Sequence, residues 1–188
     1  MIGYKAEGLT PKEGKFIIFV CTGNTCRSPM AEGLANYLFR MEALDGMWHA
    51  LSAGTVVYGR FPAVPEAVRV MNRFGIDIST HRTRNIRDIA IVGDTLFVGM
   101  TSAHVYTIKN EITGSKGNVI RLYDLYLECG GSANKNASMF LCKNGDIPDP
   151  IGNSDEIYFD IATTIKNLLL PVIETIKRSP YRLPLFSR

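Results

Sequence analysis

The chain carries a cysteine and an arginine, separated by five residues, within residues 20–32, VCTGNTCRSPMAE. A thiol beside a guanidinium and several backbone N–H groups ionises well below its ordinary pKa of about 8.5, and the thiolate is a nucleophile. The planar guanidinium can hold two oxygens of a phosphoryl group and match the charge that develops on them during transfer. Cys21 and Arg27 therefore predict nucleophilic chemistry at phosphorus.

The residues around this pair suit a loop that wraps an anion. Gly23 lets the backbone approach an oxyanion closely, and Asn24 tolerates a left-handed turn. The Ser28 hydroxyl can donate a hydrogen bond to the cysteine sulfur and help it to leave a phosphocysteine. We expect the whole loop to bind phosphate, through Thr22, Gly23, Asn24, Thr25 and Cys26.

A buried strand and an amphipathic helix are predicted to hold the loop. Residues 15–20, KFIIFV, are apolar without alternation, which is typical of a strand buried on both faces of a parallel sheet. Pro29 suits the first helical turn, and Ser28 before it can cap the helix. Such a connection aims N–H groups and the positive end of the helix dipole at one point, so an ordinary structural cysteine is disfavoured. The apolar face of the helix comprises Met30, Leu34, Tyr37, Leu38 and Met41.

The rest of the chain alternates strand and helix patterns. Further strands are predicted over 48–53, 94–100 and 118–122. Alternation of this kind predicts an α/β fold, a single three-layer domain with a four-stranded parallel sheet and the phosphate-binding loop after the first strand. Predicted helices cover 64–74, ending at Gly75, then a segment capped by Thr101 that runs to about Asn110, and a long final helix from Ser154 with a kink at Pro171.

The motif CTGNTCRS, followed by PMAE, resembles the signature of the low-molecular-weight protein tyrosine phosphatase family. Close relatives in that family include protein arginine phosphatases and thioredoxin-coupled arsenate reductases. The resemblance covers about residues 15–178 and implies a cysteine-dependent phosphoprotein phosphatase that forms a phosphocysteine intermediate. Further matching segments are Ser52–Thr55, Gly75–Arg82, Met100–Thr101 and Asp149–Pro150.

The resemblance also implies a general acid and a substrate wall. The leaving group must be protonated as it departs, and Asp146, Asp149 and Asp155 all supply a carboxyl group for this step. Asp149 is preferred because Asp-Pro followed by Ile-Gly-Asn most resembles the family motif. Tyr58 resembles by position the aromatic residue that lines the family's substrate cleft, whereas Ile151 replaces the usual aromatic residue after Asp-Pro.

Thr25 bears on the choice of phosphoamino acid. Phosphotyrosine enzymes of the family usually have an aliphatic residue at this position, whereas the phosphoarginine enzymes of the family resemble this sequence. A hydroxyl can hydrogen-bond the polar guanidinium of phosphoarginine, so phosphoarginine is slightly favoured over phosphotyrosine.

Two other functions stay open at this point. Arsenate reduction needs a cysteine relay, which similar reductases keep after the third strand, and residues 100–109 contain no cysteine. Cys129 and Cys142 would serve only if residues 127–146, predicted to be an inserted loop, fold over the site. A non-catalytic phosphoprotein-binding module is expected to lack the nucleophile or the acid. A Cys21–Cys26 disulfide that protects the nucleophile from over-oxidation is also conceivable.

Composition sets the remaining expectations. The chain has 188 residues and a net charge of +3, which suits phosphorylated protein substrates but is too small to argue for nucleic acid. No apolar segment resembles a signal peptide or a membrane span, so a cytoplasmic location with reduced cysteines is expected. The four cysteines and three histidines lack the spacing of a metal site, and no cofactor is expected. The predicted division is an N-terminal extension, 1–14, a phosphatase domain, 15–178, and a C-terminal tail, 179–188.

Overall fold

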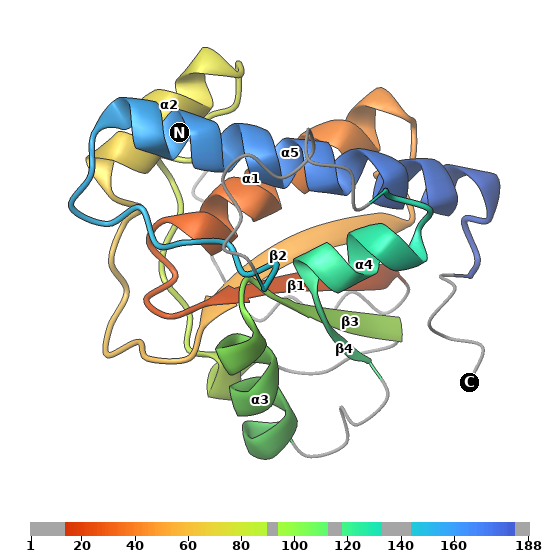
Figure 1. The fold of residues 1–188 in the computed structure, drawn as a ribbon, viewed down its shortest axis with the longest axis horizontal. Coiled ribbons are helices and arrows are strands. Elements are labelled where there is room, and N and C mark those ends of the chain that lie inside the picture. Colours follow the sequence, from red (N-terminus) through yellow and green to blue (C-terminus); the bar gives the residue numbers. More distant parts are fainter. Residues whose placement is uncertain (1–13, 90–93, 113–117, 133–143, 183–188) are drawn as a thin grey trace, which may run out of the picture.

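The computed structural model describes residues 14–89, 94–112, 118–132 and 144–182. Strands and helices alternate along these residues, and a short 3₁₀ turn, η1, occupies Ile86–Asp88 (Figure 1). The elements are β1 (Lys15–Cys21), α1 (Arg27–Met41), β2 (Trp48–Gly54), α2 (Pro65–Arg73), β3 (Asp94–Gly99), α3 (Ser102–Glu111), β4 (Val119–Arg121), α4 (Leu122–Glu128) and α5 (Asp155–Arg178).

The strands form one four-stranded sheet in the order β2-β1-β3-β4, and every neighbouring pair is parallel. β1 lies in the interior, with Cys21 opposite Gly54 of β2 and Val20 opposite Gly99 of β3. The carboxyl ends of three strands therefore meet at one edge, which is where open parallel sheets bind ligands. The predicted four-stranded parallel sheet is confirmed.

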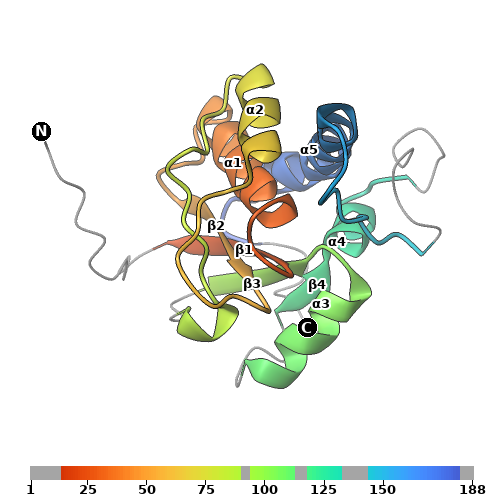
Figure 2. The same cartoon turned by 90° about the vertical axis from the view of Figure 1, so that its left-hand side faces the viewer.

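Helices cover both faces of the sheet (Figures 1 and 2). α1, α2, α4 and α5 pack on one face, and α3 lies on the other with η1. Ile17 and Phe19 of β1 point into the larger core, whereas Ile18 and Val20 point into the smaller one. Burial on both faces explains why β1 is apolar without alternation, and the three-layer α/β prediction is confirmed.

Three local predictions were wrong. α1 begins at Arg27 with Cys26 at its N-cap, so Ser28 lies inside the helix, where its hydroxyl has other partners. Met41, at the end of α1, is 65% exposed and does not continue the buried face. The strand predicted over 118–122 includes Leu122, but β4 ends at Arg121 and Leu122 begins a helix, α4, in which Leu122, Leu125 and Tyr126 bury one face. It is too short for sequence periodicity to reveal.

The final helix runs without interruption from Asp155 to Arg178 and includes Pro171. Proline removes one backbone hydrogen bond from a helix, but burial on both sides of Pro171 holds the segment together. The residues buried there are Leu168, Leu169, Val172 and Ile173. Much of the predicted insertion, including Cys142, lies outside the described residues.

Gly54 joins the sheet to the loop that follows β1. A Cβ atom at Gly54 would lie 2.5 Å from the carbonyl oxygen of Thr22 and 3.0 Å from the backbone nitrogen of Asn24. Real Cβ atoms essentially never come as close as 2.5 Å to another heavy atom, and a contact of 3.0 Å is also tighter than most. The end of β2 and the β1–α1 loop can therefore lie side by side only with glycine at this position.

We expect Gly54→Ala to lower the free energy of unfolding by about 1–3 kcal/mol, because the added methyl group must push two backbone segments apart. Gly46→Ala is the matched control, since a Cβ at Gly46 meets nothing within 4 Å. Its effect should stay within about 0.5 kcal/mol. Urea denaturation measures both variants, and equal losses of stability would contradict the proposed close packing at Gly54.

Candidate active site

The β1–α1 loop, residues 22–26, lies at the carboxyl edge of the sheet between Cys21 and Arg27. The segment that follows β2 runs beside it. The backbone nitrogens of Thr55 and Val56 donate to the carbonyl oxygens of Cys21 (3.0 Å) and Thr22 (2.9 Å). Val64 donates in the same way to Thr25 (3.0 Å). Segment 55–64 thus holds the loop through backbone hydrogen bonds to three carbonyl groups.

Asn24 fixes the inside of the loop. It adopts a left-handed conformation, with φ of 55°, and is fully buried. Its side-chain Nδ2 donates to the hydroxyl oxygens of Ser28 and Ser52, both at 2.9 Å. Its Oδ1 accepts from the backbone nitrogen of Arg84 at 2.9 Å. Because these contacts use both ends of the amide, the side chain holds the turn in one shape.

Cys21 is buried at the end of β1, and its Sγ lies 2.9 Å from Oγ of Ser28. The same hydroxyl oxygen accepts from Asn24 and lies 3.2 Å from the carbonyl oxygen of Ala53. A hydroxyl has one proton, so Ser28 can donate either to the sulfur or to that carbonyl. This places a donor beside the sulfur that can stabilise a thiolate.

The guanidinium of Arg27 crosses from the loop to the segment before α5. Its Nη1 donates to the carbonyl oxygen of Ile147 at 3.1 Å, and its Nη2 donates to a carboxylate oxygen of Asp149. Nε is buried and has no hydrogen-bond partner within the described residues. A buried donor without a partner is rare and costly, so this N–H is suited to an anion held in the loop.

A polar network supports the loop from α1, β2 and the segment before η1. The Ser52 hydroxyl donates to Glu32, whose carboxylate lies 3.6 Å from Arg84. His81 contacts the carbonyl oxygen of Asn24 through Nε2 at 2.8 Å. Burial raises the pKa of Glu32 and lowers the pKa of His81 to about 4. The imidazole is therefore neutral near pH 7, and its Nε2 carries the proton because a carbonyl oxygen can only accept.

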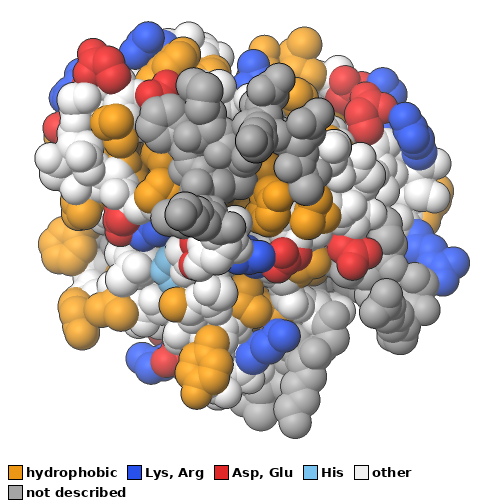
Figure 3. All heavy atoms as spheres, viewed as in Figure 1, with side chains coloured by type: hydrophobic (Ala, Val, Ile, Leu, Met, Phe, Trp, Pro, Cys, Tyr) orange, Lys and Arg blue, Asp and Glu red, His pale blue; other side chains and the backbone are white. Residues whose placement is uncertain are grey.

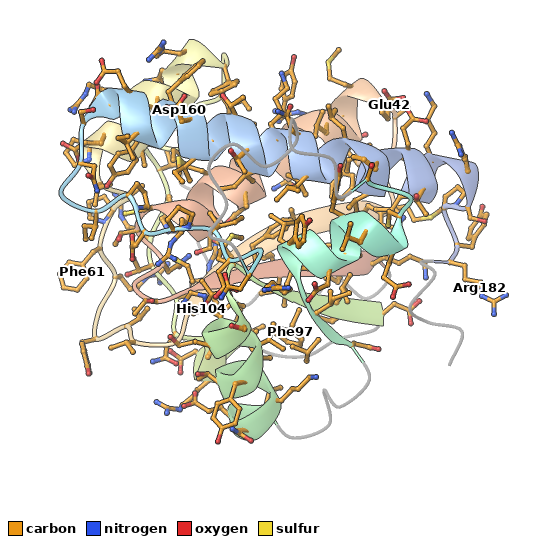
Figure 4. The ribbon with its side chains drawn as sticks, viewed as in Figure 1. Glu42, Phe61, Phe97, His104, Asp160 and Arg182 are labelled. Carbon is orange, nitrogen blue, oxygen red and sulfur yellow. The ribbon has the colours of Figure 1, made fainter. Side chains whose placement is uncertain are left out.

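His104 supports the loop from the opposite side of the sheet. It lies in the first turn of α3 (Figure 4), with Nε2 3.0 Å from the Thr22 hydroxyl and Nδ1 2.9 Å from the Thr101 hydroxyl. Thr101 is the predicted N-cap, which the structure confirms through its contact with the His104 nitrogen. Burial and the nearby Arg27 charge lower the pKa of His104 to about 4. A neutral imidazole thus bridges α3 and the β1–α1 loop.

The sequence did not reveal these supporting residues. Glu32, Ser52 and His81 come from three different segments, so no spacing marks them as a set. His104 follows the N-cap Thr101 by three residues. The threonine indicates the start of a helix, but it does not indicate that His104 contacts the β1–α1 loop.

The three candidate carboxylates have different surroundings. Asp149 is the one bound by Arg27, and its side chain is 44% exposed. Burial opposes ionisation of Asp146, but hydrogen bonds from Arg121 and Ser102 outweigh it and hold its pKa below the ordinary value. Asp155 pairs with Arg69 at the start of α5, and these hydrogen bonds lower its pKa. Asp149 is therefore the candidate that reaches the loop.

The expected substrate-wall residues are exposed. Tyr58 is 93% exposed and Ile151 is 62% exposed. Val56 and Phe61, on the same segment as Tyr58, are also exposed. Phe61 lies at the left edge of the molecule in Figure 4, where Figure 3 shows several hydrophobic side chains on the surface. Apolar contact surface is thus available beside the loop.

The cysteines differ in position. Cys26 is buried under the loop, with Sγ 3.5 Å from the hydroxyl oxygens of Thr25 and Tyr158, and burial raises its pKa. Cys129 lies at the other end of α5, where its carbonyl oxygen accepts from Thr175. Within the described part of the chain, no three His, Cys, Asp or Glu side chains are grouped so that they could bind a metal ion. No helix there combines the length and the apolarity that a membrane span requires.

Curated relatives include tyrosine and arginine phosphatases and arsenate reductases. A protein-arginine-phosphatase of Bacillus subtilis is 30% identical over 162 residues, 86% of this chain and 97% of that protein. The probable low molecular weight protein-tyrosine-phosphatase EpsP of Ralstonia nicotianae is 36% identical over 111 residues, 59% of this chain and 72% of that protein. Arsenate reductase 1 of Staphylococcus epidermidis is 36% identical over 88 residues, 47% of this chain and 61% of that protein.

Solved structures show the same fold over nearly their whole length. The low molecular weight protein tyrosine phosphatase of T. tengcongensis is 34% identical, with a TM-score of 0.69, over 86% of this chain and 99% of that chain. A cysteine-to-serine variant of the YwlE arginine phosphatase, with a phosphorylated active site serine, is 27% identical, with a TM-score of 0.69, over 87% and 97% of the two chains.

The family model for low molecular weight phosphotyrosine protein phosphatases matches residues 16–181. This match spans the sheet, the β1–α1 loop and the segment that carries Asp149. The chain therefore belongs to the low-molecular-weight protein tyrosine phosphatase family.

Proposed function

We propose that this protein hydrolyses phosphorylated side chains of proteins, with Cys21 as nucleophile, Arg27 as phosphate ligand and Asp149 as general acid. One observation carries the proposal. The Arg27 guanidinium, which begins α1 next to the loop, donates to Asp149, so the phosphate ligand and the acid meet at one point. Cys21 opens the same loop, with the Ser28 hydroxyl 2.9 Å from its sulfur.

The proposed reaction has two steps. The Cys21 thiolate attacks phosphorus, the S–P bond forms, and the bond from phosphorus to the leaving oxygen or nitrogen breaks. Asp149 gives its proton to the leaving group. A water molecule then attacks the phosphocysteine and Asp149 takes a proton from it. The S–P bond breaks, phosphate is released and the thiolate is restored with help from Ser28.

The loop supplies the electrostatic part of the mechanism. Thr22, Gly23, Asn24, Thr25 and Cys26 would offer backbone N–H groups to the phosphate oxygens, and the start of α1 adds its positive dipole. The YwlE variant with a phosphorylated serine supports covalent transfer, because there the group at the active site carries the phosphoryl group. A thiolate nucleophile also fits a reducing compartment such as the cytoplasm.

Among phosphoamino acids, Thr25 favours phosphoarginine. Its hydroxyl, 3.5 Å from the Cys26 sulfur, can accept a hydrogen bond from the guanidinium of the substrate. Ile151 is consistent with this choice because it provides no aromatic wall for a phenol ring. Exposed Tyr58 favours an aromatic substrate instead, so phosphotyrosine is the second candidate.

The position of Cys129 argues against an arsenate reductase relay. Tyr158 of α5 contacts Cys26, whereas Thr175 of the same helix contacts Cys129. At 1.5 Å per residue these two helix positions lie about 25 Å apart, so Cys129 does not reach the loop. Arsenate-dependent oxidation of thiols by the purified protein would revive this function. A non-catalytic binding module is disfavoured, since Cys21, Arg27 and Asp149 are all present.

Replacing the nucleophile should abolish turnover. We expect Cys21→Ser to remove measurable hydrolysis of p-nitrophenyl phosphate, because serine is a far weaker nucleophile than a thiolate. Acid quenching of the wild-type enzyme with labelled substrate should trap the phosphoryl group on Cys21. Cys129→Ser is the control and should keep both activity and labelling. Label on another residue, or turnover by Cys21→Ser, would contradict the mechanism.

The substrate preference should depend on the hydroxyl at position 25. We expect Thr25→Ile to shift the ratio of kcat/KM values from phosphoarginine peptides towards phosphotyrosine peptides by about tenfold or more, as loss of a polar contact requires. Thr25→Ser keeps the hydroxyl and should retain the wild-type ratio. An unchanged ratio in Thr25→Ile would show that Thr25 does not select the substrate.

A further inference from the structure

The segment that leads to Asp149 is attached to the junction of β4 and α4. Arg121, the last residue of β4, donates through Nη1 to the Asp146 carboxylate at 2.9 Å and to the carbonyl oxygen of Asn144. Its Nε and Nη2 bind both carboxylate oxygens of Asp124, at 3.1 and 2.7 Å. One guanidinium thus joins the start of α4 to residues 144–146, which precede α5 and are coloured cyan in Figure 1.

Asp146 extends this attachment to α3. Its carboxylate accepts from the backbone nitrogen of Ser102 at 2.9 Å and from the Ser102 hydroxyl at 3.1 Å. It also accepts from the side chain of Asn144 at 3.0 Å. The side chains of Arg121 and Asp146 are only 15% and 16% exposed. Such a shielded, fully hydrogen-bonded pair differs from a surface ion pair, which has little effect on geometry.

Gly145 makes the same junction sterically tight. It has a positive φ of 82°, and a Cβ atom there would lie 2.4 Å from the ring of Tyr123 in α4. The Arg121 guanidinium lies 5.9 Å from the centre of that ring. Residues 144–146 therefore rest directly on the first turn of α4.

A short and stiff link joins this attachment to the acid. Asp149 follows Asp146 by three residues, and the intervening and following positions include Pro148 and Pro150. Proline fixes its own φ and restricts the residue before it, so Asp149 has little backbone freedom. Ile147 within the link donates to the carbonyl oxygen of Met100 at 3.0 Å and accepts from Arg27. A displacement of Asp146 would therefore also displace Asp149.

We propose that Arg121 is a positioning residue for the general acid and that, with Asp146 and Gly145, it sets where the Asp149 carboxyl group meets the leaving group. This inference rests on the proposed function, because it assigns Asp149 the role of acid. Arg121 touches neither the nucleophile nor the β1–α1 loop through any contact in the described residues. Its effect should therefore fall on proton donation and not on phosphate binding.

The leaving group separates these two effects. A phenol with a pKa of about 10 needs a proton as it departs. A nitrophenol, which is much more acidic, departs with little help. We expect Arg121→Lys and Asp146→Asn each to lower kcat/KM for phenyl phosphate by about tenfold, which is part of the 10²–10⁴-fold that general acids contribute. This quantity covers only the steps up to departure of the leaving group, so it does not include the later role of Asp149 with water. For p-nitrophenyl phosphate the same variants should lose less than about threefold in kcat/KM.

Three further variants complete the test. Gly145→Ala, which displaces the segment without removing a charge, should show the same dependence on the leaving group. Arg87→Gln removes a 2.7 Å arginine–glutamate pair at the end of α3 and should change neither rate. The double variant Arg121→Lys/Asp149→Asn should be no slower than Asp149→Asn alone, since a misplaced acid and an absent acid are the same defect.

The outcomes distinguish the inference from the function beneath it. Equal losses of kcat/KM on both substrates in the Arg121 and Asp146 variants, or full additivity with Asp149→Asn, would overturn the positioning role alone. If Asp149→Asn itself loses kcat/KM equally on both substrates, the assignment of the acid fails and the positioning role fails with it. Active Arg121 variants whose loss is confined to phenyl phosphate would support both.

Discussion

The hydrogen bonds from Arg27 to residues 147–149 are the interaction on which the site depends. The guanidinium side chain is only 5% exposed, and a charge so shielded from water needs partners within the protein. It finds the carbonyl oxygen of Ile147 and the carboxylate of Asp149. A motif near the start of the chain is thereby joined to a segment about 120 residues later. The residues proposed as nucleophile, phosphate ligand and acid are thereby held at one place.

The order of the strands in the sheet brings these distant segments together. β1 lies between β2 and β3, so the segments that leave these strands all emerge beside the β1–α1 loop. Backbone N–H groups from Thr55, Val56 and Val64 fix one side of the loop, and His104 of α3 fixes the other through Thr22. The loop therefore does not rely on its own sequence alone for its shape. A loop that is held in one shape from both sides would need no rearrangement during the proposed reaction.

Local patterns allowed much of this to be predicted from the sequence. β1 and α1 are long and strongly patterned, and the cysteine, arginine and serine of the motif are close together in the chain. The same reasoning missed α4, which is seven residues long, and misplaced the start of α1, because neither periodicity nor capping preferences define such short features. Met41 fits the apolar face by spacing, yet it lies beyond the last point at which α1 contacts the core.

Contacts between distant segments could not be predicted in the same way. The network of Ser52, Glu32 and His81 and the pair of Arg121 with Asp146 form only when the fold brings separate elements together. Each of these residues has an ordinary local role, in a strand, a helix or a turn, that gives no hint of its partner. The family resemblance selected Asp149 from three carboxylates, and in the structure Asp149 is the one of the three that Arg27 binds.

The contact between Arg27 and Asp149 also bears on where a substrate would lie in the proposed reaction. Two of the three guanidinium nitrogens of Arg27 already bind the segment before α5, through the carbonyl oxygen of Ile147 and the carboxylate of Asp149. The third nitrogen, Nε, is buried and has no hydrogen-bond partner within the described residues. An anion bound to Nε would satisfy this donor without displacing either of the other contacts. In the proposed mechanism, one buried arginine would thus hold the phosphoryl group and the acid at the same time.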